Sequence, residues 1–268
     1  MVSVVIASYN QIRTLPLSLE SFAVQTVLPS MVIIADDGSC DGTPEWVDSL
    51  PDDAYPFPVR YTTGRHNGYG LTVSENRAAS KVSGGRLLFT NADVVHNPTS
   101  VEAHGSMSDN FIAGGRICEI AEPYSHEIAP VDLDPFDVFL DEYGCHLSDL
   151  SNSGYVSNSP RENFYGIWGG NLSIDAWRFK ILGGFDEEYR GKYGGEEADM
   201  IQRFFTMGGD VAWAYSSTAY HLAHSSKIYR GRADGNTKYR EDYAATDNHL
   251  ESRTQRTTTN RKRFQNNP

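Results

Sequence analysis

Short apolar segments alternate with helical patterns through the first 90 residues, and this alternation restricts the fold more than any other feature. The patterns predict strands at residues 2–7, 31–35, 59–62 and 86–90 and helices at residues 15–24, 44–50 and 71–82. Strands that alternate with helices at this pace form a largely parallel sheet whose two faces are covered by the helices. The sequence therefore predicts an α/β fold.

The chain of 268 residues is long enough for one large α/β domain or two small ones. Residues 119–162 break the alternation, because Pro, Asp, Ser and Asn recur there and the periodicity is weak. We expect loops and short elements in this segment, which is where substrate specificity is often determined.

Two adjacent carboxylates, Asp36 and Asp37, follow directly on the second predicted strand. In an open α/β sheet, ligands bind just outside the carboxyl ends of the strands, so both carboxylates are expected at the edge of a ligand crevice. The alternative is an Asx-type turn before the next helix, and Asp41 is expected to cap that helix. Taken alone, the segment favours neither interpretation.

Asn91 and Asp93 follow the fourth predicted strand. Positions two apart in an extended chain point to the same side, so both side chains can face one ligand. Oxygen donors at a strand end suit Mg²⁺ or Mn²⁺. One Asp does not make a complete metal site, so a cation there needs further protein ligands, waters or phosphate oxygens.

Acidic residues also follow the paired glycines Gly194 and Gly195. One carboxylate among Glu196, Glu197 and Asp199 is a candidate general base, although acidic residues favour helix N-termini in any case. Farther along, His221 and His224 follow a strand-like run, and each is a candidate metal ligand or a buried structural histidine.

Composition predicts a protein of a reducing compartment, the cytoplasm, and the basic C-terminal residues leave open a peripheral place at a membrane surface. The three cysteines Cys40, Cys118 and Cys145 are an odd number without the spacing of a metal site. No apolar run approaches the roughly 20 residues that a membrane-spanning helix needs.

The charge is distributed unevenly, although the net charge is −12. Residues 225–268 hold ten Lys or Arg against five Asp or Glu, so the acidic excess lies in the first 224 residues. A basic extension of this kind suits an anionic partner, such as a membrane surface or a nucleic acid. The alternative is a solvated and partly disordered terminus.

The order of these motifs resembles that of the family-2 nucleotide-sugar glycosyltransferases with the GT-A fold. The resemblance covers about residues 1–226 and lies in Val2–Asn10, Asp36–Ser39, His66-Asn67-Gly68, Asn76-Arg77, Asn91-Ala92-Asp93 and the segment from Glu196-Glu197 to His221. It implies a GT-A (Rossmann-like) fold with a mixed, mostly parallel sheet flanked by helices. Residues 1–115 would form the nucleotide-sugar-binding half, 116–226 the acceptor-binding and catalytic half, and 227–268 a basic C-terminal extension.

The resemblance also implies which residues bind the donor: Ala7, Ser8, Tyr9, Asp37, Asn67, Gly68, Asn76, Asn91, Ala92 and Asp93. Asp37 would accept a hydrogen bond from the base. Asp93 would hold a divalent cation, Mn²⁺ or Mg²⁺, that bridges the diphosphate. His221 resembles the family's C-terminal metal-binding histidine, with His224 as second choice. Asn91 stands where the family has Asp, which lowers the negative charge beside the cation.

Glu196 and Glu197 align with the family's pair of acidic residues, whose second member is the base, so Glu197 is the implied base. On the acceptor side we expect Trp168, Gly169, Gly170 and Asn171, where the Trp168 ring stacks on a sugar. A place for Trp168 in the core is the other interpretation.

The implied function is a metal-dependent, inverting transfer of a sugar from a nucleoside-diphosphate donor, with a UDP-sugar favoured, to a hydroxyl group. A glycan, a lipid-linked glycan, a protein and a nucleic acid all remain open as acceptors. One alternative is a nucleotidyltransferase, but residues 8–11 lack the Gly-rich, basic phosphate loop that such enzymes use. The other is a non-catalytic nucleotide-sugar-binding module.

Overall fold

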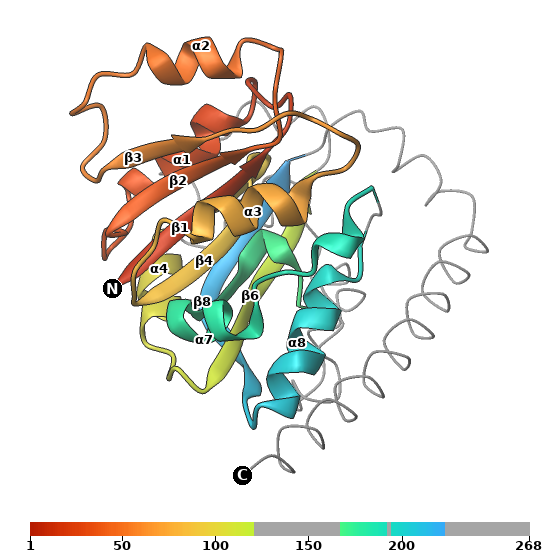
Figure 1. Cartoon of the computed structure of the whole chain (residues 1–268). Coiled ribbons are helices and arrows are strands. Elements are labelled where there is room, and N and C mark those ends of the chain that lie inside the picture. Colours follow the sequence, from red (N-terminus) through yellow and green to blue (C-terminus); the bar gives the residue numbers. More distant parts are fainter. Residues whose placement is uncertain (121–166, 192–193, 223–268) are drawn as a thin grey trace. The chain divides into compact units, whose positions relative to one another are not determined.

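The computed structural model describes residues 1–120, 167–191 and 194–222 (Figure 1). The chain divides into two units, Met1–Ala223 and His224–Pro268; the boundaries predicted after residues 115 and 226 stay predictions. Most of the segment 119–162, His224 and the basic extension lie outside the described residues. None of the helices within the described ranges is both long and apolar enough to cross a lipid bilayer.

The N-terminal half of the sheet is parallel, as the alternation predicts. β1 (Val2–Ser8) lies between β2 (Met31–Asp36) and β4 (Arg86–Asn91), and β3 (Val59–Thr62) pairs with the far side of β2. All four strands agree with their predicted bounds to within one residue. Short runs of Val, Ile, Leu and Phe suit strands that are covered on both faces.

The register of these strands decides which side chains meet at the carboxyl edge of the sheet. Ser8 of β1 is paired with Asp36 of β2, and Ala7 is paired with Asn91 of β4. The residues that follow the three strands therefore emerge at one edge, although they lie far apart in the sequence.

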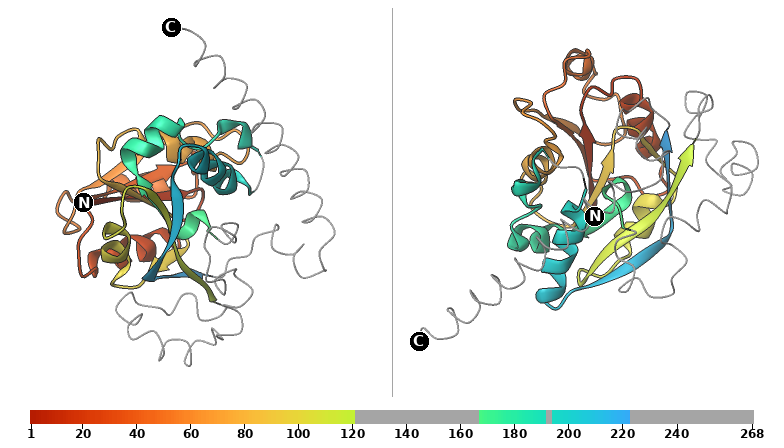
Figure 2. Two further views of the ribbon diagram at one scale, coloured as in Figure 1. Left: turned by 90° about the horizontal axis from the view of Figure 1, so that it is seen from below. Right: turned by 90° about the vertical axis from the view of Figure 1, so that its right-hand side faces the viewer.

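The second half makes the sheet mixed, with the strand order β3-β2-β1-β4-β7-β6-β8-β5. β7 (Leu172–Asp175) is antiparallel to β4 and to β6 (Phe111–Ile120). β8 (Asp210–Leu222) runs parallel to β6, and the two long strands lie side by side in Figure 2. β5 (Val94–His96) follows the turn at the end of β4 and pairs antiparallel with β8. This pairing brings the end of β8 to the carboxyl edge of the sheet.

Helices cover both faces of the sheet, and apolar residues alternate between the two faces along each strand. Val4 and Ile6 face α1 (Leu15–Ala23) and α4 (Ser100–Gly105), and α2 (Thr43–Asp48) packs on the same cluster. Val5 and Phe89 face the other cluster, which holds α3 (Leu71–Ala79), α7 (Ala176–Leu182) and α8 (Glu196–Thr206). The last three helices lie in front of the sheet in Figure 1.

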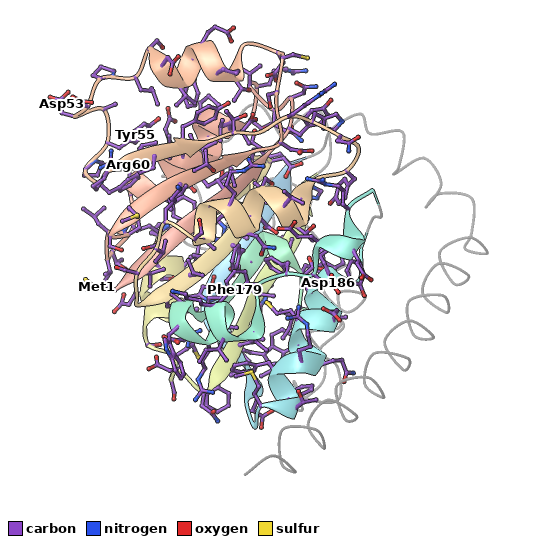
Figure 3. The ribbon with its side chains drawn as sticks, in the orientation of Figure 1. Met1, Asp53, Tyr55, Arg60, Phe179 and Asp186 are labelled. Atoms are coloured by element: carbon purple, nitrogen blue, oxygen red, sulfur yellow. The ribbon has the colours of Figure 1, made fainter. Side chains whose placement is uncertain are left out.

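Aromatic rings fix α7 against this second face. The rings of Phe89 and Phe179 have centroids 5.1 Å apart, and the Phe185 ring centroid lies 5.0 Å from that of Phe89. Phe179 is labelled on α7 in Figure 3. Fully burying a side chain of this size stabilises the fold by about 1.5–3 kcal/mol. Because Phe185 lies near the start of η6 (Glu187–Tyr189), this packing also positions the chain that leads to α8.

α3 ends at Ala79, three residues before the predicted end at Val82. Beyond Ala79 the hydrogen bonds change, since the amides of Lys81 and Val82 donate to the carbonyls three residues earlier instead of four. The helical pattern thus continues as a tighter turn of the 3₁₀ type, which is common at helix ends.

A buried polar network connects α4 with β7 and with η5 (Gly169–Asn171). His104 Nε2 lies 2.8 Å from Asn171 Oδ1, and His104 Nδ1 lies 2.7 Å from the Ser173 hydroxyl, which accepts a hydrogen bond from Arg86. Because an amide oxygen only accepts, Nε2 carries the proton and Nδ1 accepts from Ser173. The network therefore needs a neutral imidazole, and burial lowers the pKa of His104 to about 4.

We predict that replacing His104 with Gln removes part of the acid sensitivity of the fold. In the unfolded chain His104 takes up a proton near pH 6.5, but in the folded protein it does so only near pH 4. The stability advantage of the wild type over His104→Gln should therefore fall by up to about 3 kcal/mol between these pH values. Urea denaturation across this range measures the difference, and an advantage that does not change with pH would contradict the assignment.

Candidate functional site

Asp36 organises the loop after β2 and does not face a ligand. Its side chain is completely buried and accepts hydrogen bonds from the amides of Gly38 and Ser39, each at 2.9 Å. The hydroxyls of Ser39, Tyr61 and Thr63 also donate to it. The expectation that Asp36 lies open at the edge of a crevice is therefore wrong, because the loop itself uses its carboxylate.

Asp41 holds the same loop from its other end. One of its oxygens accepts from the Ile12 amide at 2.9 Å, and the other lies 3.2 Å from the Thr43 amide. Gly42 is the residue at the N-cap of α2, with a left-handed φ of 97°. Asp41, the predicted cap, therefore lies one residue before the observed N-cap, and it ties the β1 loop to the start of α2.

Asp37 lies at the sheet edge and is joined to an aromatic pair. Its Oδ2 is 2.8 Å from His66 Nδ1 and accepts from the Gly70 amide at 3.0 Å. The His66 ring stacks on Tyr9, with centroids 4.0 Å apart and an angle of 11° between the planes. Since Tyr9 is 42% exposed, this group offers an accessible ring face beside a carboxylate, as recognition of a flat base requires.

Of the other residues predicted to bind the nucleotide-sugar donor, some lie at the surface and others hold parts of the fold together. Ser8 is buried, and its hydroxyl has no hydrogen-bond partner among the described residues. Asn67 and Gly68 are exposed in the loop before α3. Asn76 exchanges two hydrogen bonds with the backbone of Phe185, so its side chain joins α3 to the segment before η6.

The Asn91-Ala92-Asp93 turn joins β4 to β5. The Ala92 amide donates to the Ala7 carbonyl at 2.9 Å, which fixes the turn against the end of β1. Asp93 is 5% exposed, and its Oδ2 lies 3.5 Å from His221 Nε2. The pairing of Val94 with His221 in β5 and β8 brings the imidazole to this position.

Asp93 and His221 fit a divalent cation that is shared with a ligand. Two neighbouring ligands of an octahedral ion with bonds near 2.1 Å lie about 3 Å apart, close to the 3.5 Å observed. A carboxylate and an imidazole suit Mn²⁺ and Mg²⁺. Within the described ranges, no group of three or more His, Cys, Asp or Glu side chains could hold a metal alone. A cation held by this pair would therefore need further ligands, such as phosphate oxygens and water.

The acidic first turn of α8 contains three carboxylates with different environments. Asp199 is 2% exposed and forms an ion pair with Arg203 at 2.8 Å. Glu196 is 3% exposed. Glu197 keeps more surface exposed, and its Oε1 accepts from the Gly169 amide at 2.8 Å. Of the three, Glu197 is best placed to meet a second substrate.

A buried carboxyl that the sequence does not single out lies with this pair. Glu75 of α3 is 1% exposed, and its Oε1 has no hydrogen-bond partner among the described residues. Burial raises the pKa of Glu75 well above its usual value, and the charges of Glu197 and then Glu196 add to the rise. The Glu75 carboxyl therefore holds its proton more tightly than an exposed Glu does.

The same environment affects the α8 pair. Burial raises the pKa of Glu196 well above its usual value, with a further contribution from the charge of Glu197. Burial also raises the pKa of Glu197. Hydrogen bonds from its own amide and from the Gly169 amide lower this pKa, but by less than burial raises it. Perturbed carboxyls of this kind occur at sites of proton transfer.

The Trp168–Asn171 segment connects the two parts of the site. Trp168 is partly buried and packs on a small cluster with Val94 and Ile117. A Cβ at Gly169 would lie 2.8 Å from Glu197 Oε1, so a side chain there would displace this carboxylate. At Gly170 a Cβ would lie 3.9 Å from Asn91 Nδ2. This turn therefore lies between the candidate base and the Asn91–Asp93 motif.

Asn171 belongs to the scaffold of this turn. It is completely buried, with its oxygen beside His104 and its amide donating to the Arg116 carbonyl at 2.9 Å. Its side chain holds the turn in place and is not available to an acceptor. Pattern alone did not indicate this, because the partners of Asn171 come from distant elements.

Comparisons with known proteins agree with this geometry. Residues 3–107 match the model of glycosyl transferase family 2, and residues 152–225 match a model described as the N-terminal domain of galactosyltransferase. A validoxylamine A glucosyltransferase of Streptomyces hygroscopicus subsp. limoneus is 26% identical over 242 residues, which cover 84% of this chain and 52% of the relative. The chain thus spans about half the length of the curated relatives that it matches.

Solved structures share the fold at low sequence identity. S. aureus TarS 1-349 in complex with UDP-GlcNAc has a TM-score of 0.60 and 14% identity, with 84% of this chain and 59% of that chain covered. The mannosyltransferase PcManGT from Pyrobaculum calidifontis, in complex with GDP-Man and Mn²⁺, has a TM-score of 0.59 and 15% identity, with 86% and 59% covered.

We predict that Glu75→Gln stabilises the protein at neutral and higher pH. The folded protein retains a proton on Glu75 that the unfolded chain releases above about pH 4.5, so the wild type loses stability as the pH rises. The gain in the free energy of unfolding should be about 1–3 kcal/mol near pH 8 and should decrease towards pH 4. Thermal or urea unfolding measures it. The exposed Glu45→Gln is the control, and an equal gain in both variants would contradict the prediction.

Proposed function

Because the chain belongs to glycosyltransferase family 2 and has the GT-A fold, we propose that it transfers a sugar from a nucleoside-diphosphate donor to a hydroxyl group. The observation that carries this proposal is the approach of Asp93 to His221, 3.5 Å apart at the carboxyl ends of the parallel strands. A diphosphate can share a cation with such a pair, and the curled β8 strand supplies the second ligand.

The donor side is assigned to Asp37, Tyr9 and Ser8, which surround the ends of β1 and β2. Tyr9 offers its exposed ring to the base, and Asp37 accepts a hydrogen bond from it. A UDP-sugar is the favoured donor. The curated relative is named a glucosyltransferase, so a glucose conjugate is the first donor to test.

The cation would be Mn²⁺ or Mg²⁺, held by Asp93 and His221. When bound, it neutralises the charge that grows on the departing diphosphate. Asn91 contributes a neutral amide where the family has a carboxylate, so the two protein ligands and the diphosphate carry most of the binding.

Glu197 is the proposed general base that removes the proton of the acceptor hydroxyl. The Gly169 amide orients its carboxylate, and burial raises the pKa of Glu197 and so its affinity for the proton. A raised pKa makes a carboxylate a better base at neutral pH, as long as it is still ionised. Attack from the side opposite to the diphosphate inverts the anomeric configuration.

Binding of nucleoside diphosphates tests the donor site. We expect UDP to bind the wild type in the presence of Mn²⁺ and to lose at least about tenfold in affinity without it, because a cation held by Asp93 and His221 would neutralise the charge of the diphosphate. Asp93→Ala should remove this dependence on Mn²⁺, as measured by calorimetry. The control is Asp53→Ala, an exposed carboxylate far from the sheet edge (Figure 3). If no nucleoside diphosphate binds the wild type, the proposal is wrong.

Turnover of Glu197→Gln tests the base. The substitution keeps the shape of the side chain but cannot accept the proton, so kcat should fall by about 10²–10⁴-fold. The affinity for UDP should stay unchanged, and Glu188→Gln, exposed in η6, is the control. In the wild type, activity should decline as the pH falls towards the pKa of Glu197, which lies above that of an exposed Glu. Near-normal turnover of Glu197→Gln would exclude it as the base.

A further inference from the structure

Gln11 lies in the loop between β1 and α1, 82 positions before Asp93 in the sequence, and it touches the candidate cation site. We propose that Gln11 is a positioning residue, whose side-chain amide holds the Asp93 carboxylate in the orientation that faces His221. This inference rests on the proposed function, because it assigns a role at the same cation site.

Gln11 contacts the same carboxylate oxygen of Asp93 that lies near His221. Gln11 Nε2 donates to Asp93 Oδ2 at 3.2 Å, and the same oxygen lies 3.5 Å from His221 Nε2. The amide and the imidazole therefore approach one carboxylate oxygen. A hydrogen bond to this oxygen restricts the rotation of the carboxylate, so a cation meets a ligand pair that is already oriented.

Chemistry fixes which end of the Gln11 amide faces Asp93. An ionised carboxylate can only accept hydrogen bonds, so it requires the amide nitrogen. The Thr14 hydroxyl lies 3.1 Å from Gln11 Oε1, the other end of the amide, and donates to it. Both contacts agree on one orientation, and each end of the amide is occupied.

The backbone of Gln11 is held as firmly as its side chain. Its carbonyl accepts from the amides of Thr14 at 3.1 Å and Leu15 at 2.9 Å, at the first turn of α1. Leu15 is completely buried beneath that turn. The side chain therefore starts from a fixed backbone position, and the Thr14 hydroxyl restrains its far end.

A neutral amide is well suited to this position. A Lys or Arg in place of Gln11 would donate to Asp93 but would repel the cation, and a carboxylate would repel Asp93. Gln11 donates a hydrogen bond without adding charge. Groups that orient the ligands of a metal in this way typically contribute 10–100-fold to its affinity.

Titration of Mn²⁺ in the presence of UDP tests the inference, with calorimetry and the electron paramagnetic resonance of free Mn²⁺ as readouts. The variants are Gln11→Ala, which removes the amide, and Thr14→Val, which keeps the amide but releases its far end. Glu20→Gln, exposed on α1, is the control. Thermal unfolding of each variant reports whether the fold is retained.

We expect Gln11→Ala to bind Mn²⁺ about 10–100-fold more weakly than the wild type. Thr14→Val should show a smaller loss, and the affinity for UDP without metal should not change in either variant. Excess Mn²⁺ should restore the metal-dependent binding of UDP. If Gln11→Ala fails to fold, the loss in Thr14→Val decides.

Two results would overturn the role of Gln11 and leave the proposed function intact. One is a Mn²⁺ affinity of Gln11→Ala within twofold of the wild type. The other is a loss of metal-free UDP binding as large as the loss of Mn²⁺ binding, which would indicate a general distortion of the loop. Failure of the wild type itself to bind Mn²⁺ in the presence of UDP would instead contradict the proposed cation site, and the inference would fall with it.

Discussion

The parallel pairing of β1 with β2 and β4 is the constraint on which the site depends. It places Ser8 beside Asp36 and Ala7 beside Asn91, so three loops distant in sequence begin at one edge. Both faces of these strands are buried beneath helices, so a shift in register would have to repack the apolar clusters on both sides of the sheet. The positions of Asp37 and Asp93 are therefore consequences of core packing.

The buried polar groups near the site are of two kinds. Some hold its loops in place, and others are available for proton transfer. Asp36 and Asn171 have several partners and hold loops. Glu75 and Glu196 have buried oxygens without a hydrogen-bond partner among the described residues. Such groups cost stability, and they lie beside Glu197, the carboxylate proposed to accept a proton. Stability is commonly lower where function requires a strained or unpaired group.

Much of the fold could be predicted because its signals are local. The strands in the first half of the chain have bounds within one residue of the expected ones, since a short apolar run between turn residues suffices to define each. The role of Asp36 could not be predicted in this way, because Tyr61 and Thr63 reach it from another strand. The roles of Glu75 and Gln11 could not be predicted for the same reason, because the residues that act on each come close to it only in the folded chain.

The sequence by itself determined the α/β architecture, the carboxylates after the second and fourth strands and the motifs that resemble a glycosyltransferase, because these depend on the order and periodicity of neighbouring residues. Only the tertiary structure decided which carboxylates face a ligand and which are consumed by the scaffold. It joined Asp93 to His221 through the pairing of β5 with β8 and to Gln11 across the β1 loop. The physical reason is that hydrogen bonding and burial depend on distance in space, which no local pattern of residues records.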